Sequence, residues 1–320
     1  MSMGFSPWQQ RAFERALASL DSGRLGHGLL VCGPAKLGKR ALVDAIVARL
    51  LCQDASGAQP ACGHCRACKL QQAGTHADAY RISFALNDKG EPRNVIVVEQ
   101  IRDLGQKISL TAQLGGAIVS VIDPAEALNA NAANALLKTL EEPQDGRYLI
   151  LVSDTPYRLP ATIRSRCQRI ELRPPPLEEA RAWLAGQGID GSRIDEALAL
   201  ADGHPGAALA LIEAQGLQLR RAVEKDLDAL AQNRIALSET VKAWLDDRPA
   251  ERLAHAAACV RDRGRLALLA LLAQGSGEAF AELADWYDQA NRVRAQLDTP
   301  LRSDLLLGEL LLRWREVAAA

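Results

Sequence analysis

The chain has few aromatic residues, almost no net charge and no long apolar run. Aromatic residues make up 4% of its 320 residues, and 38 basic residues stand against 39 acidic ones, for a formal net charge of -1. A protein that holds DNA alone by neutralising phosphates is usually more basic, so we expect any DNA contact to be local or shared with partners. The longest apolar stretch, residues 266–273, is far too short to span a bilayer.

The beginning of the sequence also lacks a targeting signal. Residues 1–10 carry no signal-peptide pattern. We therefore expect a cytoplasmic protein, in which the seven cysteines are reduced or bound to metal and do not form disulfides. The length suits two or three domains better than one simple core.

Apolar runs typical of strands alternate with helical patterns in the first half of the chain. The patterns predict strands over 27–32, 94–98, 117–122 and 148–152, and helices over 9–20, 40–51 and 131–140, with a further helix ending near Ser109. Such alternation favours a parallel α/β sheet with right-handed crossovers.

A stiff connector interrupts this alternation. Arg173 is followed by three prolines, which indicate a domain boundary. Beyond it only helical patterns occur, and the C-terminal half is rich in the helix formers Ala and Leu. We predict an α/β domain over 1–172, a small helical domain over 173–211 and an all-helical domain over 212–320.

A glycine-rich turn joins the first predicted strand to the next helix. Residues 33–39 fit G-x-x-x-x-G-K, in which Gly33 and Gly38 let backbone N–H groups face a phosphate and Lys39 reaches the outer phosphates. The next residue should offer a hydroxyl to Mg²⁺, but it is Arg40, which cannot coordinate a metal ion. Two interpretations stay open: a turn that only closes strand to helix, or a loop that binds nucleotide without hydrolysing it.

A second part of the nucleotide machinery is also incomplete. Asp123 ends the predicted strand over 117–122, where the Mg²⁺-holding acid of an ATPase stands. In an active enzyme a glutamate normally follows and polarises the attacking water, but here Pro124 follows. Glu126 lies two residues further on, and we do not expect it to substitute. ATP and Mg²⁺ should therefore not be bound productively.

Four cysteines are clustered after the helix that follows the glycine-rich turn. Cys52, Cys62, Cys65 and Cys68 have the spacing C-x9-C-x2-C-x2-C, within an insertion over 52–68. Four thiolates in a reducing compartment suit a tetrahedral structural Zn²⁺ and leave no open position for catalysis. The alternative is four unrelated buried cysteines.

Two segments carry a family resemblance. Residues 132–143 and residues 159–167 resemble signatures of bacterial clamp-loader AAA+ subunits, and the second contains their Ser-Arg-Cys motif at Ser165, Arg166 and Cys167. The zinc knuckle after the phosphate-loop helix is similar to the gamma/tau and delta-prime branches alike. The degenerate ATPase motifs resemble the delta-prime branch, and Gly206 stands about where an active member would carry its sensor 2 arginine.

The resemblance implies a fold and a shared mechanism. It implies an AAA+-like P-loop domain, a helical lid over 173–211 and a collar over 212–320, in a ring of five subunits with gamma/tau and delta. It implies that Arg166 is an arginine finger reaching ATP on a neighbouring gamma/tau subunit, within a DNA polymerase III holoenzyme that loads the beta sliding clamp onto primer-template DNA. The alternatives are a local salt bridge for Arg166 and an ordinary monomeric bundle for the collar.

Two rival functions can be stated. An active gamma/tau-type ATPase would need Ser or Thr at position 40 and Glu at position 124, and the chain has neither. A free-standing zinc-binding DNA recognition module would need a basic recognition helix, which the balanced charge and the cysteine cluster do not provide.

Overall fold

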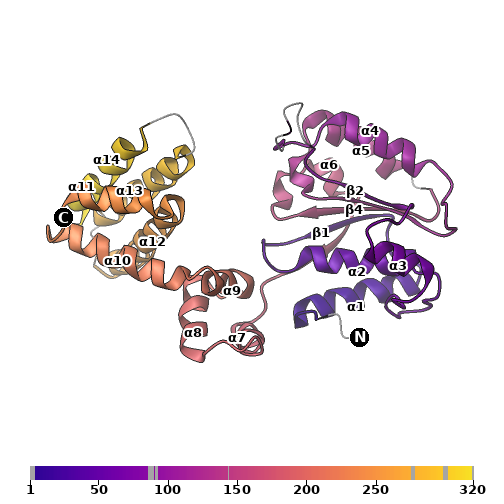
Figure 1. The fold of residues 1–320 in the computed structure, drawn as a ribbon, viewed down its shortest axis with the longest axis horizontal. Helices are drawn as coiled ribbons and strands as arrows, with labels where there is room; N and C mark the ends of the chain where they lie inside the picture. The colour runs from indigo at the N-terminus through magenta and orange to yellow at the C-terminus, as the bar shows by residue number, and fades with distance from the viewer. Residues whose placement is uncertain are drawn as a thin grey trace. The chain divides into compact units, whose positions relative to one another are not determined.

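The computed structural model describes residues 4–85, 90, 93–142, 144–274, 278–297 and 302–318. Pro143, the last residue of the first signature segment, lies outside this described part. The chain divides into two compact units, Met1–Leu209 and Ala210–Ala320, which are treated separately below (Figure 1). No helix in the described part is both long enough and apolar enough to cross a membrane.

The first unit is built on a five-stranded parallel sheet of order β2-β3-β4-β1-β5. The strands are β1 (Gly28–Cys32), β2 (Ala79–Ile82), β3 (Ile118–Ile122), β4 (Arg147–Ser153) and β5 (Gln168–Glu171). Every residue of β1 and β3 is buried, as expected for strands covered on both faces. The predicted α/β fold with a parallel sheet is confirmed.

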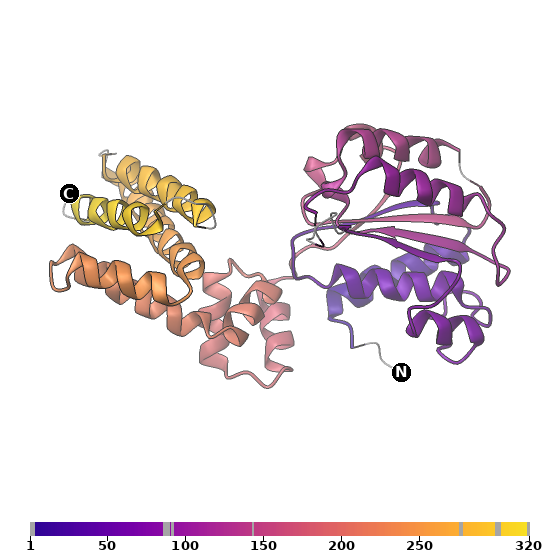
Figure 2. The same ribbon diagram turned by 45° about the horizontal axis from the view of Figure 1, so that its top comes forward.

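Helices cover both faces of this sheet, as Figures 1 and 2 show. The helices α1 (Pro7–Asp21) and α2 (Lys39–Leu51) share one core with the sheet, and α4 (Val98–Ile108) and α5 (Ala130–Glu141) share another. The shorter helices of this unit are α3 (Arg66–Gln72), α6 (Ala161–Arg164), α7 (Leu177–Ala185), α8 (Gly191–Leu200) and the beginning of α9 (Pro205–Glu213). Two single 3-10 turns, Ala125–Ala127 and Pro156–Arg158, follow β3 and β4.

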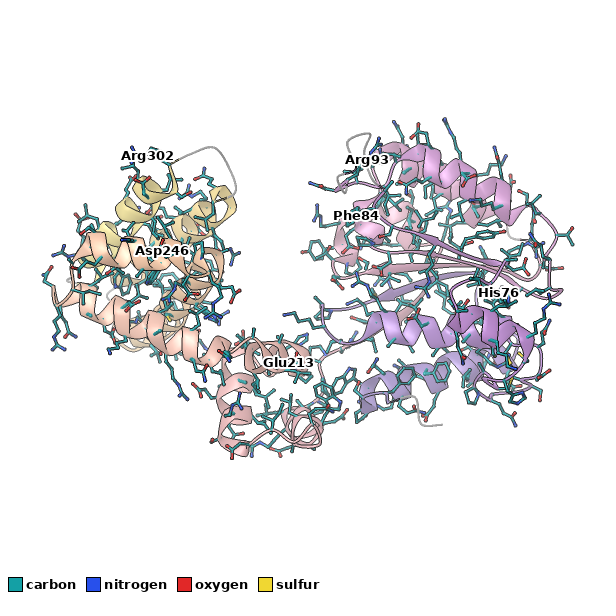
Figure 3. The ribbon with its side chains drawn as sticks, in the orientation of Figure 1. His76, Phe84, Arg93, Glu213, Asp246 and Arg302 are labelled. Carbon is teal, nitrogen blue, oxygen red and sulfur yellow. The ribbon has the colours of Figure 1, made fainter. Side chains whose placement is uncertain are left out.

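One predicted strand is wrong. Residues 94–97 form only an isolated bridge between Ile96 and Leu128, and α4 begins at Val98. The edge strand beside β3 is instead Ala79–Ile82, and Figure 3 shows His76 and Phe84 at its opposite ends. The apolar character of 94–98 reflects the burial of Ile96, whose N–H donates to the Ala127 carbonyl at 2.8 Å, and not a place in the sheet.

The second unit is helical throughout its described part. Its helices after α9 are α10 (Gly216–Ala231), α11 (Leu237–Asp246), α12 (Pro249–Gln274), α13 (Glu278–Gln296) and α14 (Ser303–Val317). Trp244, Trp286 and Trp314 are fully buried in one core, and each indole N–H has an acceptor at 2.9 Å. Large aromatic side chains with satisfied N–H groups supply much of this core. The separate roles of lid and collar stay predictions.

Candidate functional site

The glycine-rich turn has a backbone that only glycine can follow at two positions. Gly33 and Gly38 have φ values of 141° and 82°, in the region that L-residues rarely adopt. A Cβ on Gly33 would lie 2.0 Å from the Leu172 carbonyl oxygen, and one on Gly38 would lie 2.3 Å from Nε2 of Gln9. The turn is therefore packed directly against other parts of the first unit.

Helix α1 holds this turn from outside. The Trp8 indole N–H donates to the Leu37 carbonyl at 3.1 Å, and the Gln9 side-chain amide donates to the Gly38 carbonyl at 2.9 Å. Gln9 also accepts from the N–H of Ser6 at 3.0 Å, which fixes the beginning of α1. The contacts of Trp8 and Gln9 with the turn could not be predicted from sequence, because 29 residues separate the partners in each.

Lys39 is satisfied by its own unit. Its side chain is 4% exposed, and Nζ donates to the Gly33 carbonyl at 2.8 Å and to the Pro34 carbonyl at 2.7 Å. The ammonium also forms an ion pair with Asp154, directly after β4. An ammonium has three hydrogens, and each now has an acceptor within the chain.

Asp123, the acid directly after β3, forms an ion pair with Arg40 of the same chain. Nε of Arg40 lies 2.6 Å from Oδ2 of Asp123, and Nη2 lies 3.3 Å from Oδ1. This hydrogen bond raises the pKa of the Arg40 guanidinium. The carboxylate that would hold Mg²⁺ in an active ATPase thus binds the guanidinium of Arg40, which stands where such an enzyme has a hydroxyl.

The carboxylate of Glu126 has partners in the loop that follows β4. Its Oε1 accepts hydrogen bonds from the Asp154 N–H at 3.1 Å and from Oγ1 of Thr155 at 3.2 Å. The carboxylate is therefore used to fix the loop that follows β4. That Glu126 does not take over the water-polarising role stays a prediction.

The beginning of α9 closes on the same turn. A Cβ on Gly206 would lie 1.8 Å from the Lys36 carbonyl oxygen, so no side chain fits where an active ATPase would carry an arginine.

Two further contacts surround this turn. Burial lowers the pKa of His204, and the charges of Lys39 and Lys36 lower it further. Helix α7 rests on α1, because Trp183 packs edge-on against Trp8 with ring centroids 5.2 Å apart.

The four cysteines come together as predicted. The Sγ atoms of Cys52, Cys62, Cys65 and Cys68 all lie within 4.8 Å of one another. Backbone N–H groups point at three of the sulfurs: Cys62 N lies 3.4 Å from Cys52 Sγ, Cys65 N lies 3.3 Å from Cys62 Sγ, and Cys68 N lies 3.4 Å from Cys65 Sγ. Convergent thiols with N–H donors to sulfur suit thiolate ligands of a tetrahedral metal ion.

The thiols of this cluster differ in their tendency to ionise. Burial opposes ionisation of Cys65, but N–H groups of Cys68 and Gln53 and neighbouring thiols outweigh it and lower its pKa to about 6. Burial raises the pKa of Cys68 to about 12, and hydrogen bonding to Cys65 adds to this rise. The residues fit a zinc ion, which would bind all four as thiolates.

Arg166 lies just after α6 and is bound on both of its terminal nitrogens. Nη1 donates to the Thr162 carbonyl at 3.0 Å, and Nη2 lies 2.5 Å from Oε1 of Glu141, the last residue of α5. The side chain remains 37% exposed. Arg166 therefore forms a local salt bridge within this chain, which was the alternative to an arginine finger.

Comparisons with known proteins decide the family. A family model described as DNA polymerase III, delta subunit, matches residues 8–176. The DNA polymerase III subunit delta' of Escherichia coli (strain K12) is 41% identical over 222 residues, covering 69% of this chain and 65% of that protein. That of Pseudomonas aeruginosa is 42% identical over 243 residues, covering 74% and 70%.

The chain belongs to the delta-prime family of DNA polymerase III subunits. The tau subunit of Escherichia coli is also similar, at 34% identity over 170 residues, covering 53% of this chain and 25% of that protein. The resemblance stated from the two signature segments is thereby confirmed.

This member of the delta-prime family gathers its sequence-predicted residues into three groups. Gly33, Gly38, Lys39 and Asp123 lie around one turn, the cysteines form a second group, and Arg166 stands with Glu141 as a third. Sequence reasoning missed Asp154 and Glu141. The position of Asp154, directly after a predicted buried strand, could have indicated it, because strand ends of a parallel sheet share one edge.

Proposed function

We propose that this chain is a non-hydrolysing member of the DNA polymerase III clamp loader that supplies Arg166 in trans to ATP bound on a neighbouring gamma/tau subunit. The observation that carries the proposal is the internal pairing of the nucleotide machinery. Lys39 binds its own loop and Asp154, and Asp123 binds Arg40. The delta-prime family membership supports the placement in the complex.

Hydrolysis in this chain would require several changes at once. A triphosphate would have to displace Asp154 from Lys39, and Mg²⁺ would have to displace Arg40 from Asp123. Phosphoryl transfer depends on positioned metal and on charge stabilisation, and no glutamate follows Asp123 to orient water. The turn therefore serves as a packing element between α1, α2 and α9.

An arginine in trans would complete a neighbour's site. A guanidinium offsets charge that develops on the γ-phosphate, and such a finger is worth roughly 10³–10⁵ in rate in GTPases. Arg166 is partly exposed and lies outside the group around Lys39, so it is available to another chain. The planar fork of arginine matches phosphate oxygens better than an ammonium does.

The remaining parts support assembly. Zinc would be held by Cys52, Cys62, Cys65 and Cys68 and would stabilise the insertion that follows α2. The second unit exposes Leu266 and Leu269 on α12 and Leu305 on α14, apolar surface suited to a collar formed with gamma/tau and delta. The beta clamp and primer-template DNA would be contacted through the assembled complex, in the cytoplasm.

Reconstitution tests this function. Gamma/tau and delta are combined with or without this chain, and ATP turnover and clamp loading are measured with and without primed DNA. We expect DNA-stimulated turnover and clamp loading to require the chain. Full activity without it would overturn the proposal, and DNA binding by the isolated chain with a steep salt dependence would favour the recognition-module alternative.

A further inference from the structure

Glu141 and Arg166 connect two short stretches that the sequence presents as separate signatures. Glu141 ends α5, and Arg166 follows α6. Their side chains meet with Oε1 to Nη2 at 2.5 Å, while Thr162 accepts from Nη1 at 3.0 Å. Two acceptors of the chain itself therefore hold the guanidinium against the end of α5.

We propose that Glu141 is a positioning residue that holds Arg166 in a resting position, and that ATP turnover next door requires exchange of its carboxylate for the γ-phosphate. This inference rests on the proposed role of Arg166 as an arginine finger. It adds a carboxylate that restrains the finger until a neighbour's nucleotide competes for it.

The competition follows from the chemistry of the two acceptors. Carboxylate and phosphate oxygens both bind guanidinium through charge-assisted hydrogen bonds, so they compete for the same donors. A guanidinium has five N–H donors, and the contacts with Glu141 and Thr162 occupy one on each terminal nitrogen. The other donors remain for a phosphate to approach, and the nearby carboxylate repels that phosphate while it stays in place.

The strength of the contact suits a reversible restraint. Both side chains are substantially exposed, 37% for Arg166 and 50% for Glu141. Exposed ion pairs are weak, so this contact should shift the balance between resting and engaged positions by only about two- to fivefold. A buried pair would hold the arginine too firmly to be exchanged.

The chain supplies a matched control at the next position. Glu142 stands at the same end of α5 and is also exposed. Among the described residues, Arg166 pairs with Glu141 and not with Glu142. Glu142 instead lines a cavity of about 550 Å³ together with Lys138 and Arg147. Glu142→Gln removes the same charge from the end of α5 as Glu141→Gln does, but it leaves the contact between Glu141 and Arg166 intact.

The test uses reconstituted complexes carrying wild-type chain, Glu141→Gln, Glu142→Gln, Arg166→Ala or Glu141→Gln with Arg166→Ala. We expect Glu141→Gln to raise ATP turnover without DNA about two- to fivefold, and so to reduce the stimulation by primed DNA. Glu142→Gln should match wild type. In the Arg166→Ala background, Glu141→Gln should have no further effect, because the carboxylate acts only through the arginine.

The outcomes separate the two proposals. Unchanged or lower turnover in Glu141→Gln, or an equal rise with and without Arg166, overturns the restraint while leaving the finger in place. Normal turnover in Arg166→Ala overturns the finger and the restraint together. If Glu141→Gln fails to assemble, an arginine-selective dicarbonyl reagent applied to the isolated chain gives the answer: Arg166 should react faster in Glu141→Gln than in Glu142→Gln, and equal rates contradict the restraint.

Discussion

The guanidinium of Arg40 and the carboxylate of Asp123 form a two-point ion pair, with Nε 2.6 Å from Oδ2 and Nη2 3.3 Å from Oδ1. The arginine comes from the beginning of α2, and the acid directly follows β3. A cation of the chain itself thus neutralises the acid that an ATPase would use for Mg²⁺. The pair joins one departure from the ATPase motif, Arg40, to an acid that the motif retains, Asp123.

The isolated chain should not hydrolyse ATP. Arg40 and Pro124 replace the hydroxyl and the carboxylate that hydrolysis needs. Phosphate release by the purified chain should stay at background, and Lys39→Ala should leave this background unchanged. Steady turnover that disappears in Lys39→Ala would show that the loop is an active site.

Replacement of Cys65 should release zinc. Cys65→Ser removes one of four converging sulfurs, and metal binding supplies folding free energy to the insertion. Elemental analysis should find zinc in the wild-type chain purified without chelators and little in Cys65→Ser, whose unfolding midpoint should also fall. The control variant Cys259→Ser, which changes a cysteine of the second unit outside the cluster, should contain as much zinc as the wild-type chain. Wild-type chain without zinc would contradict a structural metal.

Replacement of Arg166 should impair a neighbour and spare this chain. Arg166→Ala should leave folding and zinc content nearly intact, because an exposed ion pair contributes little to stability. Turnover at the one adjacent gamma/tau site should fall by on the order of 10³-fold, and clamp loading with it. Arg166→Lys should restore little. Arg169→Ala, an exposed neighbour outside the motif, is the control, and equal clamp loading by Arg166→Ala would make Arg166 structural.

An added methyl group at Gly206 should destabilise the first unit. A Cβ there would lie 1.8 Å from the Lys36 carbonyl oxygen, so α9 or the turn must move. Gly206→Ala should cost about 1–3 kcal/mol in the free energy of unfolding measured with urea. Gly191→Ala, at the beginning of α8 with open space around it, should cost nothing or stabilise slightly. Equal effects of the two changes would contradict the close contact.

The second unit should lose stability in mild acid through His255. Burial lowers its pKa, and the charge of Arg220 lowers it further. Because the unfolded state then binds the proton more tightly, stability is complete above a pH of about 6.5 and is lost as pH falls toward the folded-state pKa. Urea unfolding at neutral and mildly acidic pH should show a smaller pH effect in His255→Gln. An unchanged pH effect would mean that His255 does not contribute.

The buried parts of the fold were predictable from sequence, and the edges were not. Strands β1, β3 and β4 are largely apolar and mostly buried, so their pattern is plain. Strands β2 and β5 stand at the two sheet edges with mostly polar or half-exposed residues, and neither was foreseen. The apolar pattern over 94–98 predicts a strand, but Ile96 is buried as part of a loop that makes only an isolated bridge.

The site shows the same division. The motif residues around Lys39 and the four cysteines could be named from their spacing, and Arg166 from the family resemblance. Their partners could not, because Asp154 reaches Lys39 and Glu141 reaches Arg166 only after the strands and helices are assembled. Local motifs specify which groups are present, whereas tertiary packing decides which acceptor each group receives.

Lys39 completes its contacts without any ligand, through Gly33, Pro34 and Asp154. A ligand shifts a conformational equilibrium only when it binds one state better than another. Because the phosphate loop of the proposed non-hydrolysing subunit is bound by its own carbonyls and carboxylate, we expect it to keep one conformation at any ratio of ATP to ADP. In the proposed complex with gamma/tau and delta, we expect such a chain to act as a fixed point while its nucleotide-binding neighbours move.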